Sequence, residues 1–525
     1  MNGDLLSRLV PVLILSAGFA SAQPFTQEVD LPAAGRAAWG LEADLSVVPG
    51  AYVQGSIAAD GPVTLHLTDE AGTPVRRLLD RAQGGQEFRF VAGAPMARLV
   101  LENTDSVETH AKLRLDRIVP TAEQTGMPKR YLSPRIAGLA AGGDIAAFWA
   151  QIAREGAPMI EPGTRPDTVI ATFLWRGALH NVRLWGAPAS DHVWLERLGG
   201  SDLWFASFEI PQDTRLSYAL APDVPQFDAG AGENRRALLA TVQADPLNPY
   251  TEPVDAPDQW ARRSLLELPD APEQPGMTGA DPARRGQVET LAYRSAVLGN
   301  SRDVNLYVPA GFDPEDSDTV LLILFDGPQY QREEAPLPRI FDRLIASGRL
   351  PPVVVAFVDP IDPEHRAAEL PPNANFAAAM AQELKPLVEA RLARDFVPER
   401  TAVAGSSYGG LAAAWLGLTQ PAAFGNVIAL SGSFWWGPEG WSGDEMPFMS
   451  AEWAQGENRD VRFWISAGQF EDGDERSILD TSRHLRDVLR LSGQRQVFWR
   501  NYSGGHDYAV WRGALADAMI ALFGR

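Results

Sequence analysis

The pentapeptide Gly405-Ser406-Ser407-Tyr408-Gly409 constrains this chain most, because a strand-like apolar run precedes it and a helix-like run follows it. Only Ser407 occupies the centre of the G-x-S-x-G pattern. A strand, a tight turn and a helix form the context in which such a turn presents a nucleophilic serine. Glycines flank the serine because side chains there would collide with the neighbouring strand and helix. A glycine-rich turn without chemistry is the alternative interpretation of the motif alone.

The region around this motif, residues 286–525, predicts an α/β-hydrolase catalytic domain. Apolar β-branched runs such as "TVLLILFDG", "PPVVVAFVDP" and "NVIALSGS" alternate with helical segments, of which "NFAAAMAQELKPLVEARLARDF" is the clearest. Near-continuous apolar strands separated by helices are typical of a mostly parallel sheet covered on both faces. Any catalytic chemistry is then expected at the carboxyl ends of the strands.

Two β-rich domains are predicted ahead of the catalytic domain. Residues 23–120 alternate apolar and polar side chains in short runs without a helical period, which favours a small β-sandwich. Residues 132–250 contain one helical stretch and then several strand-like runs, and residues 251–285 form a proline-rich, acidic linker. The expected fold class is therefore α/β, a C-terminal α/β-hydrolase fold preceded by two β-rich domains.

Residues 1–22 have the pattern of a secretory signal peptide. Arg8 precedes an apolar stretch from Leu9 to Phe19, and Ala20-Ser21-Ala22 supplies small residues for cleavage. A membrane anchor is the alternative, but this stretch is shorter than the roughly 18 residues that a spanning helix needs. The chain has no cysteine, which removes a disulfide framework and a lipobox. We therefore expect an exported protein, periplasmic or secreted, with no transmembrane segment after cleavage.

The formal net charge of −21 argues against partners that are themselves anionic polymers or surfaces. Nucleic acid and anionic membranes repel an acidic protein. The chain has no HExxH motif or other paired-histidine spacing, so neither a metal site nor a cofactor is expected. The expected partner is a small-molecule ester, and the sequence leaves the oligomeric state open.

A serine nucleophile needs a base, and only His484 and His506 follow Ser407 in the chain. His484 lies inside a helix-like run, whereas His506 lies in a glycine loop after the last predicted strand, where this fold presents its base. The acid should follow the preceding strand. Among the carboxylates there, Glu471 is favoured, with Asp474 or Asp472 as alternatives.

The predicted oxyanion hole combines two backbone amides. One belongs to Tyr408, directly after the nucleophile. The other comes from the loop after "LLILFDG", where Pro328 has no N–H to donate. The second donor is therefore expected to be Gly327 or Gln329, and Asp326 is given no direct role.

The segment "VAGSSYGGLAAAWLGLTQPAAFGNVIALSGSFWW" resembles the core of the enterochelin (enterobactin) esterase family, siderophore trilactone hydrolases of the esterase-D-like α/β-hydrolases. "LFDG" and "SGGHDYAVWRGAL" resemble that family's aspartate-glycine loop and catalytic-histidine segment. "FWAQIAREGAPMIE", "VIATFLWRG" and "DPLNP" resemble its N-terminal domain. The resemblance covers roughly residues 135–525, and the first β-rich domain lies outside it.

The resemblance implies an exported serine esterase that cleaves a catecholate siderophore trilactone through an acyl-enzyme, with a ferric siderophore among the candidate substrates. It makes Ser407 the nucleophile, His506 the base and Glu471 the acid. It also implies four substrate-binding residues near the cleft, with packing contacts as the alternative for the tryptophans: Trp435, Trp436, Trp511 and Arg512. A feruloyl or acetyl-xylan esterase or an acyltransferase is the leading alternative function. A non-catalytic glycan- or envelope-binding protein on the same scaffold is the second alternative.

Overall fold

The computed structural model describes residues 25–124, 129–189, 192–442, 446–455, 459–473, 477–494 and 496–524. The predicted signal segment and the alternative acid Asp474 lie outside these ranges. The chain divides into two compact units, Met1–Lys129 and Arg130–Arg525. Within the described ranges, no helix is long and apolar enough to span a membrane.

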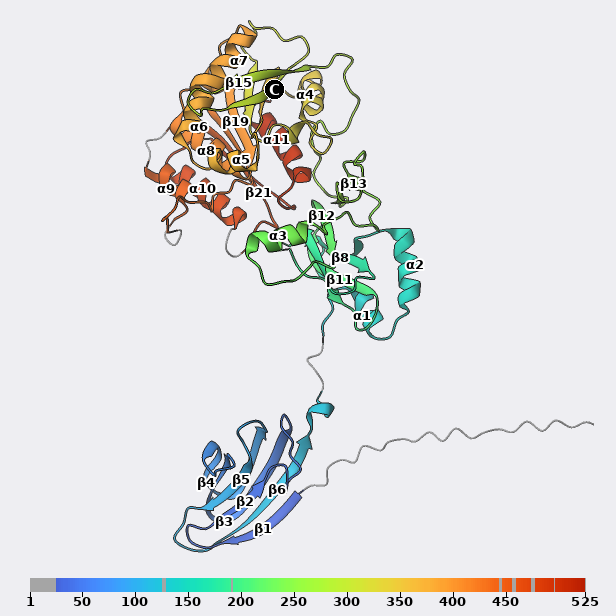
Figure 1. Ribbon diagram of the computed structural model, residues 1–525, viewed down its shortest axis with the longest axis vertical. Helices are drawn as coiled ribbons and strands as arrows, with labels where there is room; N and C mark the ends of the chain where they lie inside the picture. The colour runs from blue at the N-terminus through green and yellow to red at the C-terminus, as the bar shows by residue number, and fades with distance from the viewer. Residues whose placement is uncertain are drawn as a thin grey trace, which may run out of the picture. The chain divides into compact units, whose positions relative to one another are not determined.

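The first unit is an antiparallel six-stranded sheet in the order β1-β6-β3-β5-β2, with β4 paired to β3 (Figure 1). Its strands are β1 (Phe25–Leu31), β2 (Arg36–Gly40), β3 (Tyr52–Thr68), β4 (Pro74–Val91), β5 (Arg98–Asn103) and β6 (Thr109–Val119), followed by the short helix η1 (Thr121–Glu123). β3 is long enough to pair with β6 through its first half and with β5 through its second half. Alternate residues of β3 are buried, as expected for a strand with one face on a core.

The second unit begins with two helices and two four-stranded sheets. Its elements up to residue 267 are α1 (Pro134–Ala140), α2 (Ile145–Glu155), β7 (Met159–Pro162), β8 (Thr168–Arg176), β9 (Val182–Gly186), β10 (Glu196–Arg197), β11 (Leu203–Pro211), β12 (Arg215–Pro222), α3 (Ala231–Leu239), β13 (Thr251–Glu252) and β14 (Arg263–Glu267). The strand orders are β10-β11-β8-β7 and β13-β14-β12-β9. We call this part, residues 130–267, the N-domain.

The rest of the second unit is an eight-stranded sheet in the order β15-β16-β18-β17-β19-β20-β21-β22. Its strands are β15 (Gln287–Arg294), β16 (Ser301–Val308), β17 (Val320–Leu324), β18 (Val353–Val358), β19 (Thr401–Ser406), β20 (Asn426–Leu430), β21 (Arg462–Gly468) and β22 (Val497–Tyr502). β15 and β16 pair antiparallel, and the strands from β18 to β22 are parallel.

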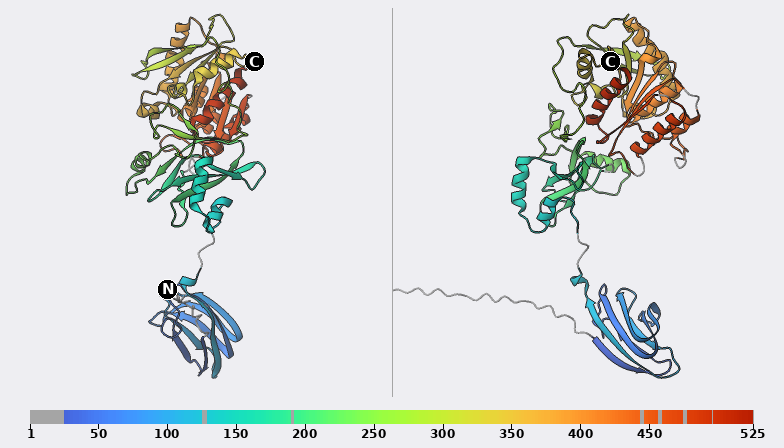
Figure 2. Two further views of the ribbon diagram at one scale, coloured as in Figure 1. Left: turned by 90° about the vertical axis from the view of Figure 1, so that its right-hand side faces the viewer. Right: turned by 180° about the vertical axis from the view of Figure 1, so that it is seen from behind.

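Helices cover both faces of this sheet, as Figures 1 and 2 show. The α-helices are α4 (Leu337–Ala346), α5 (Pro363–Glu369), α6 (Ala374–Ala379), α7 (Lys385–Leu392), α8 (Tyr408–Thr419), α9 (Phe448–Gln455), α10 (Ile478–Leu491) and α11 (Tyr508–Phe523); the short turns are η2 (Gln329–Gln331), η3 (Met380–Leu384) and η4 (Pro398–Arg400). Side chains of β17 alternate between two apolar cores. Leu321 and Ile323 face the core under α6 to α10, and Leu322 and Leu324 face the core under α4 and α11.

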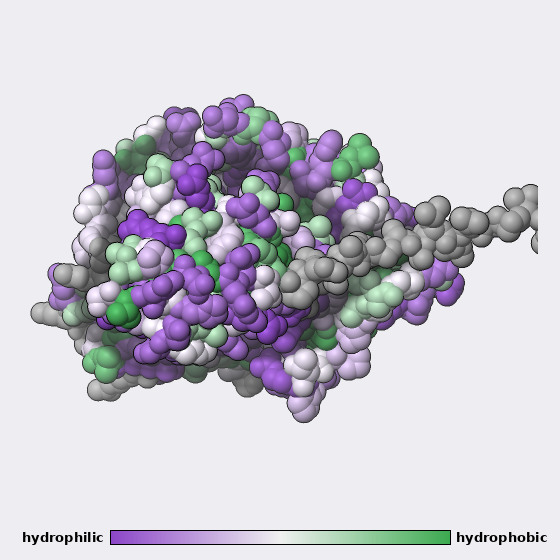
Figure 3. Space-filling view, turned by 90° about the horizontal axis from the view of Figure 1, so that it is seen from below, coloured by the Kyte–Doolittle hydropathy of each residue, from purple (hydrophilic) through white to green (hydrophobic). Residues whose placement is uncertain are grey.

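This arrangement confirms the predicted fold class, an α/β-hydrolase domain preceded by two β-rich parts. The surface seen in Figure 3 is mainly hydrophilic, and its apolar residues are scattered in small groups. That distribution is ordinary for a folded protein exposed to water. In open α/β sheets, ligands bind at the carboxyl ends of the strands, so we expect the functional site at that edge of the large sheet.

Candidate active site

Ser407 forms the turn between β19 and α8. Its backbone has φ 58° and ψ −121°, a conformation that non-glycine residues rarely adopt and that stores strain at functional turns. The Ser407 amide donates to the Leu430 carbonyl at 3.0 Å, which ties the turn to the neighbouring strand β20. The Ser407 hydroxyl lies 3.2 Å from the Ser433 hydroxyl. The serine thus stands half-buried at the carboxyl edge of the sheet.

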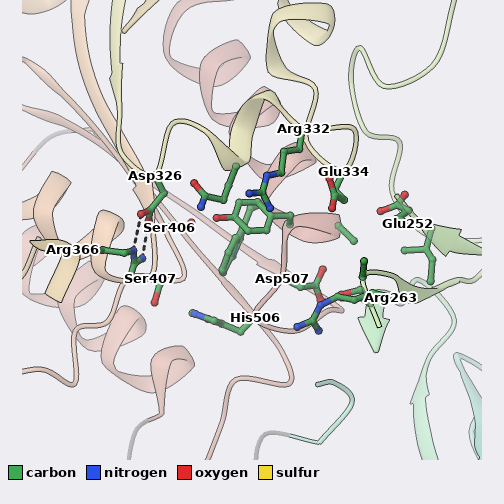
Figure 4. A pocket seen from close by; sticks show the side chains of 17 residues that line it. Glu252, Arg263, Asp326, Arg332, Glu334, Arg366, Ser406, Ser407, His506 and Asp507 are labelled. Carbon is green, nitrogen blue, oxygen red and sulfur yellow. Dashed lines mark hydrogen bonds and ion pairs between the residues drawn. The ribbon is translucent and has the colours of Figure 1, made fainter. Parts of the chain in front are cut away.

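His506 lies in the loop between β22 and α11, and it points its ring toward Ser407 in Figure 4. Its Nδ1 is 2.5 Å from Glu471 Oε1, which leaves Nε2 for another partner. The edge of its ring meets Trp511, with the ring centroids 4.7 Å apart and the planes at 88°. The other histidine after the serine, His484, lies on α10 and contacts the Ser450 hydroxyl. His506 and Ser407 line one cavity of about 540 Å³, and His484 does not line it.

Glu471 follows β21 and is held by donors from several strand ends. Its side chain is 3% exposed, and its Oε2 accepts the Ser431 hydroxyl at 2.8 Å and the Gly468 amide at 2.5 Å. The Trp511 indole N–H donates to the same Ser431 hydroxyl at 2.9 Å. Of the alternatives within the described residues, Asp472 is exposed and has no such contact. The structure therefore brings Glu471 to His506, as the favoured prediction expected.

The backbone amides expected for the oxyanion hole differ in availability. Tyr408 is the first residue of α8, so its amide has no acceptor within the helix. The Gly327 amide already donates to the Val358 carbonyl at 2.9 Å, and the Gln329 amide to the Asp326 carbonyl at 3.1 Å. The expectation of a free backbone amide at Gly327 or Gln329 is therefore corrected, because the end of the neighbouring strand β18 accepts the first amide and the turn after β17 accepts the second. Gln329 nevertheless lines the cavity.

Of the four predicted substrate-binding residues, the structure places one at the cavity. Trp511 lines the cavity, whereas Trp435 and Trp436 do not. The Trp435 ring lies 6.1 Å from the Tyr408 ring, and Trp436 packs edge-to-face on Phe448.

Arg512 is buried and makes no contact with the cavity, so its predicted role as a substrate ligand is corrected. Its guanidinium is used by protein groups: it pairs with Glu252 at 2.9 Å and also bonds Gln274 and the Glu334 carbonyl, each at 2.8 Å. These bonds use Nε and Nη1 of the guanidinium.

Sequence reasoning missed several charged residues of the cavity. Asp326, which had been given no direct role, forms a two-pronged ion pair with Arg366, drawn as dashed lines in Figure 4, at 2.6 and 2.7 Å. Asp507 follows the histidine, and the N-domain contributes Arg263 to the lining. These residues are far apart in the sequence, so their proximity could not be predicted. Asp507 alone had a sequence signal, because it directly follows His506.

Burial sets the ionisation of two groups beside His506. It raises the pKa of the Asp507 carboxyl, although the Ser217 amide donates to Asp507 Oδ2 at 3.2 Å and works in the opposite direction. It also raises the pKa of the Tyr508 hydroxyl. Within the described residues, no group of three or more histidine, aspartate or glutamate side chains is placed to bind a metal ion.

Comparison with known protein families identifies the class of enzyme to which this fold and this site belong. The family model described as a putative esterase matches residues 295–522, and the model described as the N-terminal part of enterochelin esterase matches residues 170–277. Both matches lie in the second unit. Fold and family model together define the protein as a carboxylic ester hydrolase, a serine hydrolase of the α/β-hydrolase type.

Similar individual proteins show which family of ester hydrolases the chain belongs to. An iron(III) enterobactin esterase of Dickeya dadantii (strain 3937) is 34% identical over 442 residues, which cover 76% of this chain and 97% of the relative. One of Escherichia coli (strain K12) is 32% identical, covering 67% and 90%. The crystal structure of the Shigella flexneri enterobactin esterase in the presence of enterobactin is 29% identical, with a TM-score of 0.57, and covers 73% of this chain and 98% of that one. The chain belongs to the enterochelin (enterobactin) esterase family.

Proposed function

We propose that this protein hydrolyses the ester bonds of a catecholate siderophore trilactone, with the ferric complex as a substrate. The observation that carries the proposal is the Glu471–His506 pair, 2.5 Å apart, at the cavity that also contains Ser407. The family of the chain supports the choice of substrate, because its relatives are iron(III) enterobactin esterases.

In the proposed mechanism Ser407 is the nucleophile and His506 the general base. Glu471 accepts from Nδ1, so the neutral ring keeps its lone pair on Nε2 and can take the proton from the Ser407 hydroxyl. Because the Ser407 hydroxyl rests beside Ser433, it first turns toward His506. Its oxygen then attacks the ester carbonyl, and the proton moves to Nε2.

The tetrahedral intermediate then collapses. His506 returns its proton to the leaving alcohol of the lactone, and the acyl group stays on Ser407. Water, deprotonated by His506, releases the acid and restores the serine. The Glu471 carboxylate stabilises the imidazolium in both steps.

We assign the negative oxygen of the intermediate to the amino-terminal end of α8. The Tyr408 amide and the positive end of the helix dipole favour an anion there. The side-chain carboxamide of Gln329 is our candidate for the second donor, because Gln329 lines the cavity and its backbone amide is already used.

We also propose that the protein acts outside the cytoplasm. The support is the apolar stretch Leu9–Phe19 with its small-residue cleavage pattern. Expression in a Gram-negative host, with fractionation and amino-terminal sequencing, is expected to yield exported protein that starts near Gln23. Full-length protein confined to the cytoplasm would refute this part of the proposal.

The experiment that tests the substrate compares esters from different classes at equal enzyme concentration. Ferric and metal-free enterobactin, methyl ferulate and acetylated xylan are each incubated with the protein and with Ser407→Ala, and products are separated by liquid chromatography. We expect ring opening of the trilactone that the substitution abolishes. Turnover of the plant esters alone would keep the mechanism and refute the siderophore as substrate, and no turnover of any ester would favour a binding protein.

A further inference from the structure

One segment of the N-domain, residues 250–263, forms part of the catalytic cavity, and we call it the strap. Glu252, Ala261 and Arg263 of the strap line the same cavity as Ser407 and His506. Figure 4 shows Glu252 and Arg263 on the side of the cavity away from Ser407. A substrate held for attack at Ser407 would therefore place its more distant part against the strap.

A buried guanidinium and a backbone amide tie the strap to the catalytic domain. Arg512, on α11 and six residues after His506, is 4% exposed and binds both carboxylate oxygens of Glu252 at 2.9 Å. It also bonds the Gln274 side chain and the Glu334 carbonyl at 2.8 Å. A second tie joins the Val254 amide to the Glu333 carboxylate at 3.2 Å. A guanidinium satisfied on several sides holds its partners in a fixed geometry.

Arg263 is available for a ligand, unlike the other arginines bound to the strap or the sheet edge. Arg263 is an exposed residue, and its guanidinium forms no ion pair or hydrogen bond with another side chain among the described residues. Arg366 pairs with Asp326, and Arg512 pairs with Glu252. These two carboxylates of the cavity are therefore neutralised by their own arginines.

Two carboxylates and one arginine of the cavity remain to be considered. Arg332 and Glu334 lie two residues apart after η2, and together they add no net charge to the lining of the cavity. Asp507 is near Arg263 in Figure 4, but its Oδ1 has no hydrogen-bond partner and the two residues form no ion pair among the described residues. Arg263 therefore lines the cavity, and no carboxylate bonded to it neutralises its positive charge.

We propose that Arg263 binds the anionic catecholate oxygens of the substrate on the side away from the cleaved ester, and that Arg512 is the positioning residue that holds the strap and Arg263 there. The inference rests on the proposed function. Three dianionic catecholates around one ferric ion leave a net negative charge on the complex, and neighbouring anionic oxygens suit the planar fork of a guanidinium. The N-domain would thus determine specificity, while Ser407 and His506 carry out the chemistry.

The first test compares Arg263→Gln with the wild-type protein on two esters, ferric enterobactin and the small neutral ester p-nitrophenyl acetate. We expect the ratio of kcat/KM for the ferric trilactone to kcat/KM for the neutral ester to fall about ten- to hundredfold, mainly through KM, as for the loss of a charge-assisted hydrogen bond. Arg154→Gln is the matched control, since Arg154 is an exposed N-domain arginine outside the cavity. It should keep the wild-type ratio.

The second test concerns the positioning role of Arg512. Glu252→Gln keeps the size of the partner but removes its charge, so we expect a rise in KM for the ferric trilactone and a smaller change in kcat. If Arg512 acts through Arg263, Arg263→Gln should add little when combined with Glu252→Gln. Arg512→Lys serves as a further variant, and its thermal unfolding shows whether it is folded. Independent, additive effects would overturn the positioning role even if Arg512→Lys failed to fold.

The outcomes separate the inference from the function on which it rests. If the wild-type protein cleaves ferric enterobactin and Arg263→Gln keeps the wild-type ratio, the inference is overturned and the proposed function stands. If the wild-type protein leaves the trilactone intact, the proposed function fails and the inference fails with it. A selective fall in the ratio supports both.

Discussion

At the scale of single residues, the candidate site depends on the hydrogen bonds that orient Glu471 toward His506. The serine is marked by its glycines and the histidine by its place after the last strand. Several carboxylates follow β21, and Glu471 is oriented toward His506 by the Gly468 amide at the end of the same strand and by the Ser431 hydroxyl after β20. The Ser431 donor is 40 positions away in the chain, so a local sequence pattern does not show it.

Replacing Glu471 with glutamine should slow catalysis while His506 remains in place. Without the carboxylate, the imidazolium loses its stabilising partner and the ring its fixed tautomer, so we expect kcat to fall about 10²- to 10⁴-fold. Steady-state hydrolysis of ferric enterobactin measures the change. Asp472→Asn is the control, because Asp472 is exposed, and a comparable loss there would contradict the assignment of the acid.

At the scale of elements, the alternation of strands and helices was readable because parallel strands buried on both faces are apolar throughout. β17, β18 and β19 are fully buried, as their sequences indicated. Contacts between the N-domain and the catalytic sheet could not be predicted, since they join residues far apart in the chain. Arg512 and Glu252 are 260 positions apart, so their ion pair could not be predicted, and the family resemblance alone implied that Arg512 binds substrate.

The turn between β19 and α8 should not accept a side chain at Gly405. An added Cβ would lie 2.5 Å from the Gly409 backbone carbon, closer than real contacts allow. We expect Gly405→Ala to lower the free energy of unfolding by about 1–3 kcal/mol and to reduce kcat, because the turn that presents Ser407 must shift. Denaturant unfolding and steady-state kinetics measure both effects.

Gly138→Ala provides the comparison for that variant. An added Cβ at Gly138 meets no atom within 4 Å, and the residue lies in α1. Alanine there should leave stability unchanged or raise it slightly. Equal stability of the Gly405→Ala and Gly138→Ala proteins would show that the turn tolerates a side chain.

The free energy of unfolding should depend on pH through Asp245, whose carboxyl accepts a hydrogen bond from Tyr218 of β12. Burial raises the pKa of the Asp245 carboxyl to about 6, against the hydrogen bonds from the Leu247 amide and the Tyr218 hydroxyl. The folded state therefore binds this proton more tightly than the unfolded state, in which the pKa is about 4. The stabilising contribution of Asp245 to the free energy of unfolding is full below a pH of about 4, falls by about 3 kcal/mol as the pH rises to about 6, and is constant above that pH.

Urea unfolding of the wild-type and Asp245→Asn proteins between about pH 4 and about pH 7, which spans the titration, measures this contribution. The difference in stability between the two proteins should change across that range and then level off. Parallel curves would contradict the raised pKa.

At the scale of the whole molecule, the cavity is built within one of the two units. Every residue that lines it belongs to Arg130–Arg525, from both the N-domain and the catalytic sheet. The first unit, Met1–Lys129, has its own apolar core. The sequence predicted this separate β-rich part but carried no pattern that indicates its role.

A protein that starts at Arg130 should therefore retain the esterase activity. We expect kcat and KM for ferric enterobactin within about twofold of the wild-type values, because each unit has a core of its own. Purified fragment and mature protein are compared in the same assay. A much larger loss in a fragment that is folded by circular dichroism would show that the first unit takes part in catalysis.

If Ser407 is an activated nucleophile, it should react with a fluorophosphonate. The folded protein is treated with the reagent and digested, and the modified peptide is located by mass spectrometry, with Ser407→Ala and denatured protein in parallel. We expect one adduct, on Ser407, that is absent from the variant and from the denatured chain. An unmodified Ser407 in folded protein, or an adduct on another serine, would contradict it.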